Sequence, residues 1–152
     1  MRVGLISDTH GLLRSEAVDY LRGSHFIVHA GDIGGPDVLE ALGALAPVTA
    51  VRGNNDIGKW AARIPHSASL QAGAVRIRVV HDIKELDVDP AGFRVVVSGH
   101  SHRPSVSERD GVLYVNPGSA GPRRFKLPIA AGELRVKGKS VRASITELEI
   151  GL

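Results

Sequence analysis

The sequence contains no cysteine, which excludes disulfide bonds and thiolate metal ligands. Aromatic residues are few, with one Trp, two Tyr and three Phe, and this scarcity argues against a stacking platform for single-stranded nucleic acid. No apolar run approaches the length of a membrane span, so we expect no membrane contact. A secretory signal would need a longer apolar run before the first expected strand, and the cytoplasm is therefore the expected location.

A strong excess of charge of one sign is also missing. The chain has 19 Lys and Arg against 16 Asp and Glu, a formal net charge of +3, and its basic residues are scattered except at Arg123, Arg124 and Lys126. Such a mild positive field favours anionic substrates over a short range, but it is too weak to predict nucleic acid as an obligate partner. The length of 152 residues and the hydrophobic content of 43% fit one compact domain, residues 1–152.

The first third of the chain alternates between expected strands and helices. Short apolar runs predict the strands, and apolar residues at helical spacing predict the helices. Ser15 is an expected N-cap, Gly23 an expected stop just after a helix, and Pro36 suits a first turn. The expected order is strand 3–7, helix 15–22, strand 26–29, helix 36–45 and strand 48–51. This alternation predicts a parallel sheet with right-handed crossovers.

After Pro65 the pattern changes to strands alone. Turn residues at Gly73, Asp110-Gly111 and Lys137-Gly138-Lys139 indicate hairpins between several of them. The expected strands are 69–71, 75–81, 93–98, 112–115, 127–134 and 141–150. The chain is therefore interpreted as α/β, with two packed sheets.

Residues able to bind metal ions follow the predicted strands, at the end where open α/β sheets bind their ligands. They are Asp8, His10, Asp32, Asn54, His81, His100 and His102. Glycines beside several of them permit the tight turns through which side chains from separate loops converge. Each position alone is typical of a turn or a solvated loop, but their joint order along the chain predicts a metal site.

Carboxylate, imidazole and amide ligands without sulfur suit Mn²⁺, Fe, Zn²⁺ or Mg²⁺. Seven ligands are too many for one such ion, but they suit two ions that share a bridging carboxylate. Two ions about 3.5–4 Å apart can hold a hydroxide between them and clamp phosphate oxygens. This pattern predicts a phosphoesterase whose substrate is a phosphate ester, either a small molecule or nucleotide-like.

These residues and their neighbours resemble the calcineurin-like metallophosphoesterase superfamily. The resemblance rests on Asp8-Thr9-His10-Gly11, Gly31-Asp32, Gly53-Asn54-Asn55-Asp56 and Gly99-His100-Ser101-His102. Asn116-Pro117-Gly118-Ser119 and Pro122-Arg123 further resemble its small bacterial and archaeal phosphodiesterase branch. The implied architecture is an α-β-β-α sandwich, two packed mixed β-sheets flanked by helices. The retromer scaffold subunit has a similar fold, so a non-catalytic metal-binding interaction module is the alternative function.

The resemblance also implies roles for single residues. One ion would take Asp8, His10, Asp32 and His102. The other would take Asp32, Asn54, His81 and His100, with Asp32 as the bridge. Mn²⁺ is the favoured metal, with Fe, Zn, Mg, Ni and Co as alternatives, and a bridging hydroxide would attack phosphorus in line. Asn55 and Asp56 are expected to be catalytic, and Asn55 and Arg123 to bind substrate. A homo-oligomer is left open.

Two positions depart from the superfamily pattern. Many members have His at the position of Asn55, and because Asn cannot donate a proton as a general acid, esters with poor leaving groups should react slowly. The branch usually has His-Gly and a following helix where this chain has His81-Asp82, and the Pro-interrupted segment 84–92 is too short for much helix.

A further histidine, His29, lies on an apolar strand and is expected to be a hydrogen-bonded structural residue rather than a direct ligand.

Overall fold

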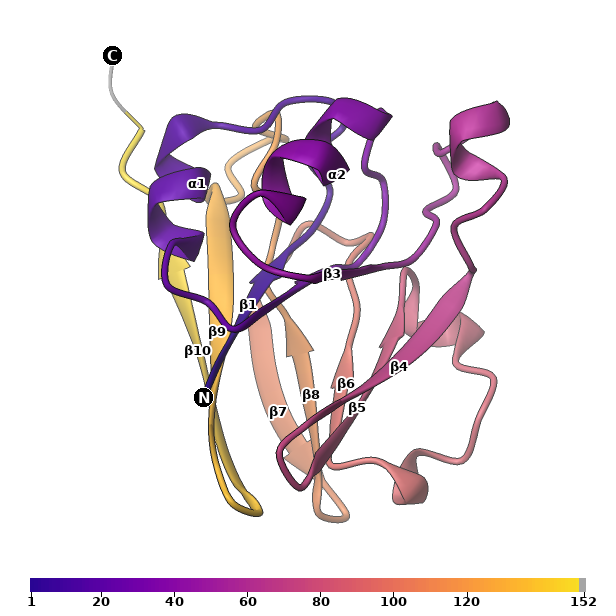
Figure 1. Ribbon diagram of the computed structural model, residues 1–152, viewed down its shortest axis with the longest axis vertical. Coiled ribbons are helices and arrows are strands. Elements are labelled where there is room, and N and C mark those ends of the chain that lie inside the picture. Colours follow the sequence, from indigo (N-terminus) through magenta and orange to yellow (C-terminus); the bar gives the residue numbers. More distant parts are fainter. Residues whose placement is uncertain (151–152) are drawn as a thin grey trace.

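The computed structural model describes residues 1–150 as two five-stranded sheets that pack against each other (Figure 1). The first sheet has the strand order β10-β9-β1-β2-β3. Its strands are β1 (Arg2–Ile6), β2 (Phe26–His29), β3 (Val48–Ala50), β9 (Ala130–Lys137) and β10 (Ser140–Glu147). The second sheet has the order β4-β5-β6-β8-β7. Its strands are β4 (Ser67–Ala72), β5 (Val75–Val80), β6 (Val95–Val97), β7 (Ser105–Arg109) and β8 (Val112–Asn116).

The parallel sheet predicted for the first third of the chain is confirmed, because β1 pairs with β2 and β2 with β3 in parallel. The connecting helices are α1 (Ser15–Leu21) and α2 (Pro36–Gly43). Pro36 opens α2, and Gly23 follows α1 with a φ of 84°, both as expected. The expected N-cap was wrong: Arg14 is the N-cap of α1, and the hydroxyl of Ser15 donates to the Glu16 carboxylate instead.

Two hydrophobic clusters hold the layers together. One lies between the sheets and joins residues such as Val3 and Leu5 of β1 to Ile77 and Val79 of β5. The other lies between the first sheet and its helices, and it includes Ile6, Leu21 and Leu42. Alternate residues of β1 thus contact opposite layers, as expected for a strand buried on both faces.

The second sheet differs from expectation at one edge. β7 is antiparallel to β8 and was not predicted, because its sequence Ser-Val-Ser-Glu-Arg is polar and all five of its residues are exposed. On the crossover from β5 to β6, the described residues form two short 3₁₀ turns, Ile83–Glu85 and Pro90–Gly92, in place of a helix. The expectation of little helix over 84–92 is confirmed, and both α-helices of the described chain cover the first sheet.

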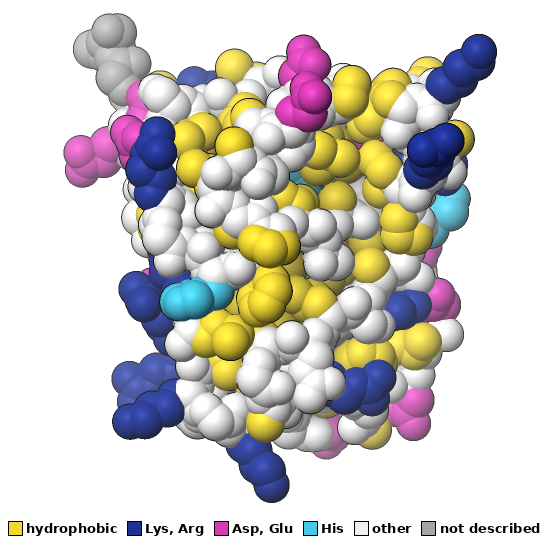
Figure 2. Space-filling model, in the orientation of Figure 1, with side chains coloured by type: hydrophobic (Ala, Val, Ile, Leu, Met, Phe, Trp, Pro, Cys, Tyr) yellow, Lys and Arg dark blue, Asp and Glu magenta, His cyan; other side chains and the backbone are white. Residues whose placement is uncertain are grey.

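Surface features fit the composition. None of the helices within residues 1–150 is long and apolar enough to cross a membrane. On the face shown in Figure 2, Lys and Arg side chains lie around the outline, and hydrophobic side chains occupy much of the centre. This face therefore offers no concentrated basic surface.

Candidate metal centre

The candidate ligands lie on loops that follow the parallel strands of both sheets. Asp8 and His10 follow β1, Asp32 follows β2, and Asn54 follows β3, whereas His81 directly follows β5 and the two remaining histidines follow β6. Several backbones there have positive φ, which is uncommon for residues other than glycine. They are Asp8 (55°), His10 (48°), Asp32 (55°), His100 (71°) and His102 (63°). Each such conformation costs about 1 kcal/mol or more, and strain of this kind is typical of functional sites.

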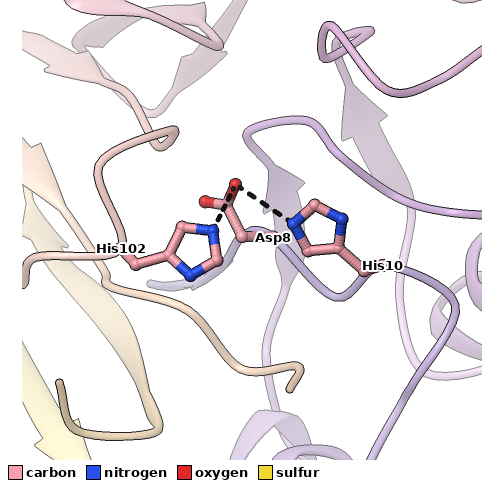
Figure 3. A group of neighbouring side chains, drawn as sticks. All are labelled: Asp8, His10 and His102. Carbon is pink, nitrogen blue, oxygen red and sulfur yellow. Dashed lines mark ion pairs between the residues drawn. The ribbon is translucent and has the colours of Figure 1, made fainter. Parts of the chain in front are cut away.

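Asp8, His10 and His102 form the first group of candidate ligands (Figure 3). Oδ1 of Asp8 lies 3.5 Å from Nε2 of His102 and 4.0 Å from Nε2 of His10. The other oxygen of Asp8 accepts hydrogen bonds from the Ser7 hydroxyl (2.7 Å) and from the backbone N–H of His100 (3.1 Å). These bonds fix the carboxylate and turn Oδ1 toward the two imidazoles.

Asp32, His81 and His100 form the second group. Oδ2 of Asp32 lies 3.2 Å from Nε2 of His81, and it also lies 3.7 Å from Nε2 of His10 in the first group. Nδ1 of His81 lies 2.7 Å from the carbonyl oxygen of Ala30, which can only accept, so Nδ1 carries the proton and donates it. That bond leaves the lone pair of Nε2 in neutral His81 directed at the site.

Unpartnered polar atoms gather at the two groups. The buried atoms without a hydrogen-bond partner in the described chain include Asp8 Oδ1, His10 Nε2, His81 Nε2 and His102 Nδ1. Buried polar atoms are normally satisfied, because leaving one without a partner costs about 1–3 kcal/mol. Carboxylate oxygens and imidazole nitrogens are the donors that Mn²⁺, Fe and Zn²⁺ accept, so this donor set fits two divalent ions.

The protonation equilibria of the site reflect the crowding of carboxylates and imidazoles. Burial opposes the charge of His81, but the Asp32 carboxylate 3.2 Å from its Nε2 and the hydrogen bond to Ala30 raise its pKa to about 9. Burial likewise opposes the charge of Asp32, but the adjacent His81 imidazole and the hydrogen bond from the Asn55 backbone hold its pKa below the usual range. Burial raises the pKa of Asp8 and lowers that of His102. Without metal, the positive charge of protonated His81 balances the negative charge of the Asp32 carboxylate. A bound cation would displace that proton and take over the charge balance.

Glycine is required where the ligand loops meet. A Cβ on Gly53 would collide with the backbone nitrogen and carboxylate of Asp32. A Cβ on Gly99 would collide with the Ser7 hydroxyl and would lie 2.7 Å from the carboxylate of Asp8. The loops can therefore approach closely enough to join the two groups only because these positions lack a side chain.

The carboxylate of Asp56 accepts hydrogen bonds from three backbone N–H groups. The donors are the N–H groups of Ile33 (3.1 Å), Gly34 (3.0 Å) and Gly53 (2.9 Å), and Asp56 is 2% exposed. These bonds tie the loop after β3 to the loop that carries Asp32. The geometry favours a positioning role for Asp56 over the direct catalytic contact expected from the sequence.

His29 is a structural residue, as the sequence predicted. Its Nδ1 accepts a hydrogen bond from the N–H of Gly31 (3.1 Å), so its Nε2–H donates to the Thr9 hydroxyl (2.9 Å), which in turn donates to the carbonyl of Ile33 (2.8 Å). Burial lowers the pKa of His29 to about 3. The neutral ring thus joins the loops after β1 and β2 and is not a member of either ligand group.

The family of this chain follows from its similarity to known proteins. Residues 1–139 match the description of the calcineurin-like phosphoesterase superfamily domain. The chain belongs to this superfamily. It is 34% identical over 160 residues to a probable metallophosphoesterase of Methanothermobacter thermautotrophicus, a match that covers 95% of this chain and 91% of the relative. It is 26% identical over 167 residues to a phosphodiesterase of Methanocaldococcus jannaschii, covering 97% of this chain and all of the relative. Among solved structures, Vps29 of Chaetomium thermophilum has a similar fold, with a TM-score of 0.78 at 17% identity, covering 98% of this chain and all of that one.

The remaining predicted residues of this superfamily member lie at the edge of the two groups. Asn54 is exposed and lines a cleft of about 260 Å³ together with His81 and His100. Asn55 donates from its side-chain amide to Oδ2 of Asp32 (3.2 Å) and from its backbone N–H to Oδ1 (2.9 Å). Arg123 is exposed and is absent from the residues lining this cleft.

Sequence reasoning missed two residues that hold the loops. Ser7 orients Asp8, and the side-chain amide of Asn116 donates to the carbonyl of Gly99 (3.0 Å) and the hydroxyl of Ser101 (3.1 Å). The signal for Ser7 was its place directly before Asp8. Asn116 belongs to a motif that supported the family resemblance, but that resemblance assigned the residue no role.

Proposed function

We propose that this protein is a phosphodiesterase that depends on two divalent metal ions. The observation that carries the proposal is the position of Asp32 Oδ2, which lies 3.2 Å from Nε2 of His81 in one ligand group and 3.7 Å from Nε2 of His10 in the other. One carboxylate oxygen within reach of both groups suits a bridging ligand. The 26% identity to a phosphodiesterase favours diesters over monoesters.

Two ions bound there would supply Lewis acidity and a hydroxide for in-line attack on phosphorus. The protein itself supplies the frame. Asp8, His10 and His102 would hold one ion, and His81, His100 and the exposed amide of Asn54 would hold the other, with Asp32 shared between them. The hydrogen bond of Ser7 orients Asp8, and the hydrogen bonds of Asp56 prevent the loops after β2 and β3 from moving apart. Rigid placement of this kind lowers the reorganisation needed when charge develops on phosphoryl oxygens.

Asn55 lies where it can contact a phosphoryl oxygen beside Asp32. Its amide can donate a hydrogen bond but cannot transfer a proton to a leaving group. We therefore propose that the preferred esters have leaving groups that depart without general acid assistance. The charge of Arg124 adds to burial in lowering the pKa of His102, so Arg124 supplies positive charge on that side of the site. We propose that its neighbour Arg123 binds the substrate phosphate.

The identity of the metal, the cellular location and the substrate are also part of the proposal. Mn²⁺ is favoured by the mixture of carboxylate, imidazole and amide donors, and the same donors accept Fe, Zn²⁺, Mg²⁺, Ni or Co. A cytoplasmic location follows the composition and stays a prediction, as does a single domain over residues 1–152. The substrate is proposed to be a small or nucleotide-like phosphate ester.

The alternative is an interaction module that binds metal without turnover. The likeness in fold to Vps29 leaves this possibility open. The completeness of the ligand set argues against it: a module without turnover is free to lose ligands, yet every expected position carries a side chain able to bind metal, and unpartnered ligand atoms remain in both groups.

Hydrolysis of bis(p-nitrophenyl) phosphate by metal-free protein with added Mn²⁺ tests the proposal. We expect Mn²⁺-dependent release of p-nitrophenol, a loss of at least about 10²-fold in kcat/KM for Asp32→Ala, and an unchanged rate for Glu40→Ala on the exposed surface of α2. Equal rates for wild type and Asp32→Ala would overturn the proposed site. Specific binding of Mn²⁺ without turnover of any phosphate ester would favour the interaction module.

A further inference from the structure

A second cavity adjoins the candidate metal centre on the outer face of the second sheet. Its volume is about 360 Å³, within the range of pockets that bind small ligands. β7 and β8 form its floor, and the turn at Ile83–Glu85 forms one wall. The cavity exists because the β5–β6 crossover consists of short 3₁₀ turns, which leave this part of the sheet uncovered.

The cavity meets the metal centre at His100 and Asp82, both of which also line the smaller cleft over the second ligand group. Oδ2 of Asp82 lies 3.8 Å from Nε2 of His100, and its Oδ1 accepts a hydrogen bond from the backbone N–H of Lys84 (3.1 Å). Asp82 is the residue that replaces the Gly usual in this branch. The two cavities therefore share a wall, and a substrate held at the metal centre can extend into either one.

The lining of the larger cavity is rich in hydrogen-bonding groups. Alternate residues of β7 contribute the hydroxyls of Ser105 and Ser107 and the guanidinium of Arg109, and Tyr114 of β8 contributes a phenol. The Arg109 guanidinium lies over the Tyr114 ring, with 5.0 Å from Cζ to the ring centroid, which holds the cation at the floor.

The charges in this cavity are unbalanced. Within residues 1–150, neither the Lys84 ammonium nor the Arg109 guanidinium has a carboxylate within salt-bridge distance, although several other arginines do. Asp82 is the acidic residue of the lining, and its carboxylate is directed at the Lys84 backbone and at His100. Two cations without acidic partners among serine hydroxyls suit an anionic group rich in oxygen.

From these contacts we infer that the cavity binds a substituent of the substrate that carries hydroxyl groups and a second phosphoryl group. The inference rests on the proposed phosphodiesterase function and narrows its substrate class to esters of phosphorylated polyols or nucleotides. The ester phosphorus lies at the metal centre, the substituent passes His100, and its second phosphoryl group pairs with Lys84 and Arg109. The hydroxyls of Ser105 and Ser107 bond to the sugar or to phosphoryl oxygens.

Two substrates that differ by one phosphoryl group test the inference. The first is thymidine 5′-(p-nitrophenyl phosphate), and the second is the same compound with a 3′-phosphate. We expect kcat/KM to be about tenfold higher for the 3′-phosphorylated compound, mainly through a lower KM, because each charged hydrogen bond in a partly exposed cleft contributes about three- to tenfold.

In Arg109→Glu and Lys84→Ala the ratio of the two kcat/KM values should fall toward one, whereas Arg109→Lys should retain most of the preference. Arg142→Ala on β10 of the other sheet is the matched control and should keep the full preference.

No preference in the wild type, or a full preference in Arg109→Glu, would overturn the inference. A separate measurement does not depend on turnover. Thymidine 3′,5′-bisphosphate should bind to the Mn²⁺-loaded protein more tightly than thymidine 5′-phosphate in calorimetry, and Arg109→Glu should remove most of the difference. If bis(p-nitrophenyl) phosphate is not hydrolysed but this difference in binding persists, the catalytic proposal fails and the binding site stands. Equal binding of the two nucleotides would overturn the site whatever the activity.

Discussion

The side-chain amide of Asn55 donates a hydrogen bond to Oδ2 of Asp32, at a distance of 3.2 Å. This oxygen is also the one nearest to His81 and His10, so the Asn55 amide and any bound cation compete for the same lone pairs. Metal binding at Oδ2 would weaken the hydrogen bond and free the Asn55 amide to contact a phosphoryl oxygen. The residue that replaces the usual histidine is thus coupled directly to the proposed bridge.

The first prediction concerns the leaving group. Because Asn55 cannot protonate the departing oxygen, kcat/KM should fall steeply as the leaving-group pKa rises, and an aryl diester should react far faster than an alkyl one. General acid catalysis contributes about 10²–10⁴-fold, so its absence is measurable. Asn55→His should flatten the series at saturating Mn²⁺ if the imidazole reaches the ester oxygen. A flat series for the wild type, with an unchanged rate in Asn55→Ala, would exclude a catalytic role for this position.

The second prediction concerns metal stoichiometry. Equilibrium dialysis against Mn²⁺ followed by elemental analysis should give two ions per wild-type chain. Asp32→Asn should bind at most one ion, because the neutral amide is a poor bridge between two cations. His102→Ala and His100→Ala each remove a ligand from a different group, so each should weaken one ion and leave about one bound. His66→Ala, which removes an exposed histidine from the cleft wall, is the control. A stoichiometry of one or less for the wild type would contradict the two-ion site.

The third prediction uses stability as the measure of metal binding. A ligand that binds only the folded state stabilises it by about 2.7 kcal/mol at one hundred times its Kd. Mn²⁺ should therefore raise the midpoint of thermal unfolding of the wild type, and Asp8→Asn should reduce the increase, because Asp8 Oδ1 is an orphaned acceptor of the first group. An equal increase for Asp8→Asn would place the ion outside this group.

The sequence predicted those features that depend on local pattern. The β1–β2–β3 parallel order followed from alternating apolar runs and amphipathic segments, and the ligand positions followed from the rule that sites form at the carboxyl ends of such strands. The β7 edge strand was missed because Ser105–Arg109 is polar and all of its residues are exposed, so no alternation of apolar residues marks it as a strand. Strand pairing with β8 through the Asp110-Gly111 turn determines its conformation.

Roles that depend on distant contacts were the hardest to predict. Asp56 lies in a motif with Asn54 and Asn55, and nothing in that motif indicates that its carboxylate accepts from Ile33 and Gly34, more than twenty residues away. The larger cavity likewise depends on β7 and the 82–85 turn lying side by side. Only the shortness of the segment 84–92 hinted that the outer face of the second sheet would be open.

The fourth prediction concerns Asp56 and the fold. Asp56→Ala leaves three backbone N–H groups without their acceptor, and the free energy of unfolding should fall by about 3–5 kcal/mol. Asp56→Asn keeps one acceptor oxygen and should lose less. Urea denaturation of the metal-free protein measures both, with Glu40→Ala as the exposed control. A loss of less than about 1 kcal/mol in Asp56→Ala would mean that water replaces the carboxylate, and a direct catalytic contact would regain support.

The last prediction is a pH dependence of stability that arises from His29. Burial lowers the pKa of His29 to about 3 in the folded protein, whereas an unfolded histidine has a pKa of about 6.5. Between these values the unfolded state binds a proton that the folded state does not, so the contribution of neutral His29 is present above about pH 6.5 and is lost as the pH falls toward 3. Linkage gives a slope of about 1.4 kcal/mol per pH unit, or about 2 kcal/mol between pH 7 and pH 5.

His29→Phe removes this titration at the cost of the bonds to Thr9 and Gly31. The variant should be less stable than the wild type at pH 7, but the difference should shrink by about 2 kcal/mol at pH 5, because only the wild type gains a proton on unfolding at this position. Urea denaturation in the presence of a chelator removes any contribution from metal release. His66→Phe, at an exposed position, should follow the wild type throughout. A constant difference between the wild type and His29→Phe from pH 7 to pH 5 would show that His29 takes up a proton in the folded state, in which case Nδ1 could no longer accept from the N–H of Gly31 and the loop after β2 would have to rearrange.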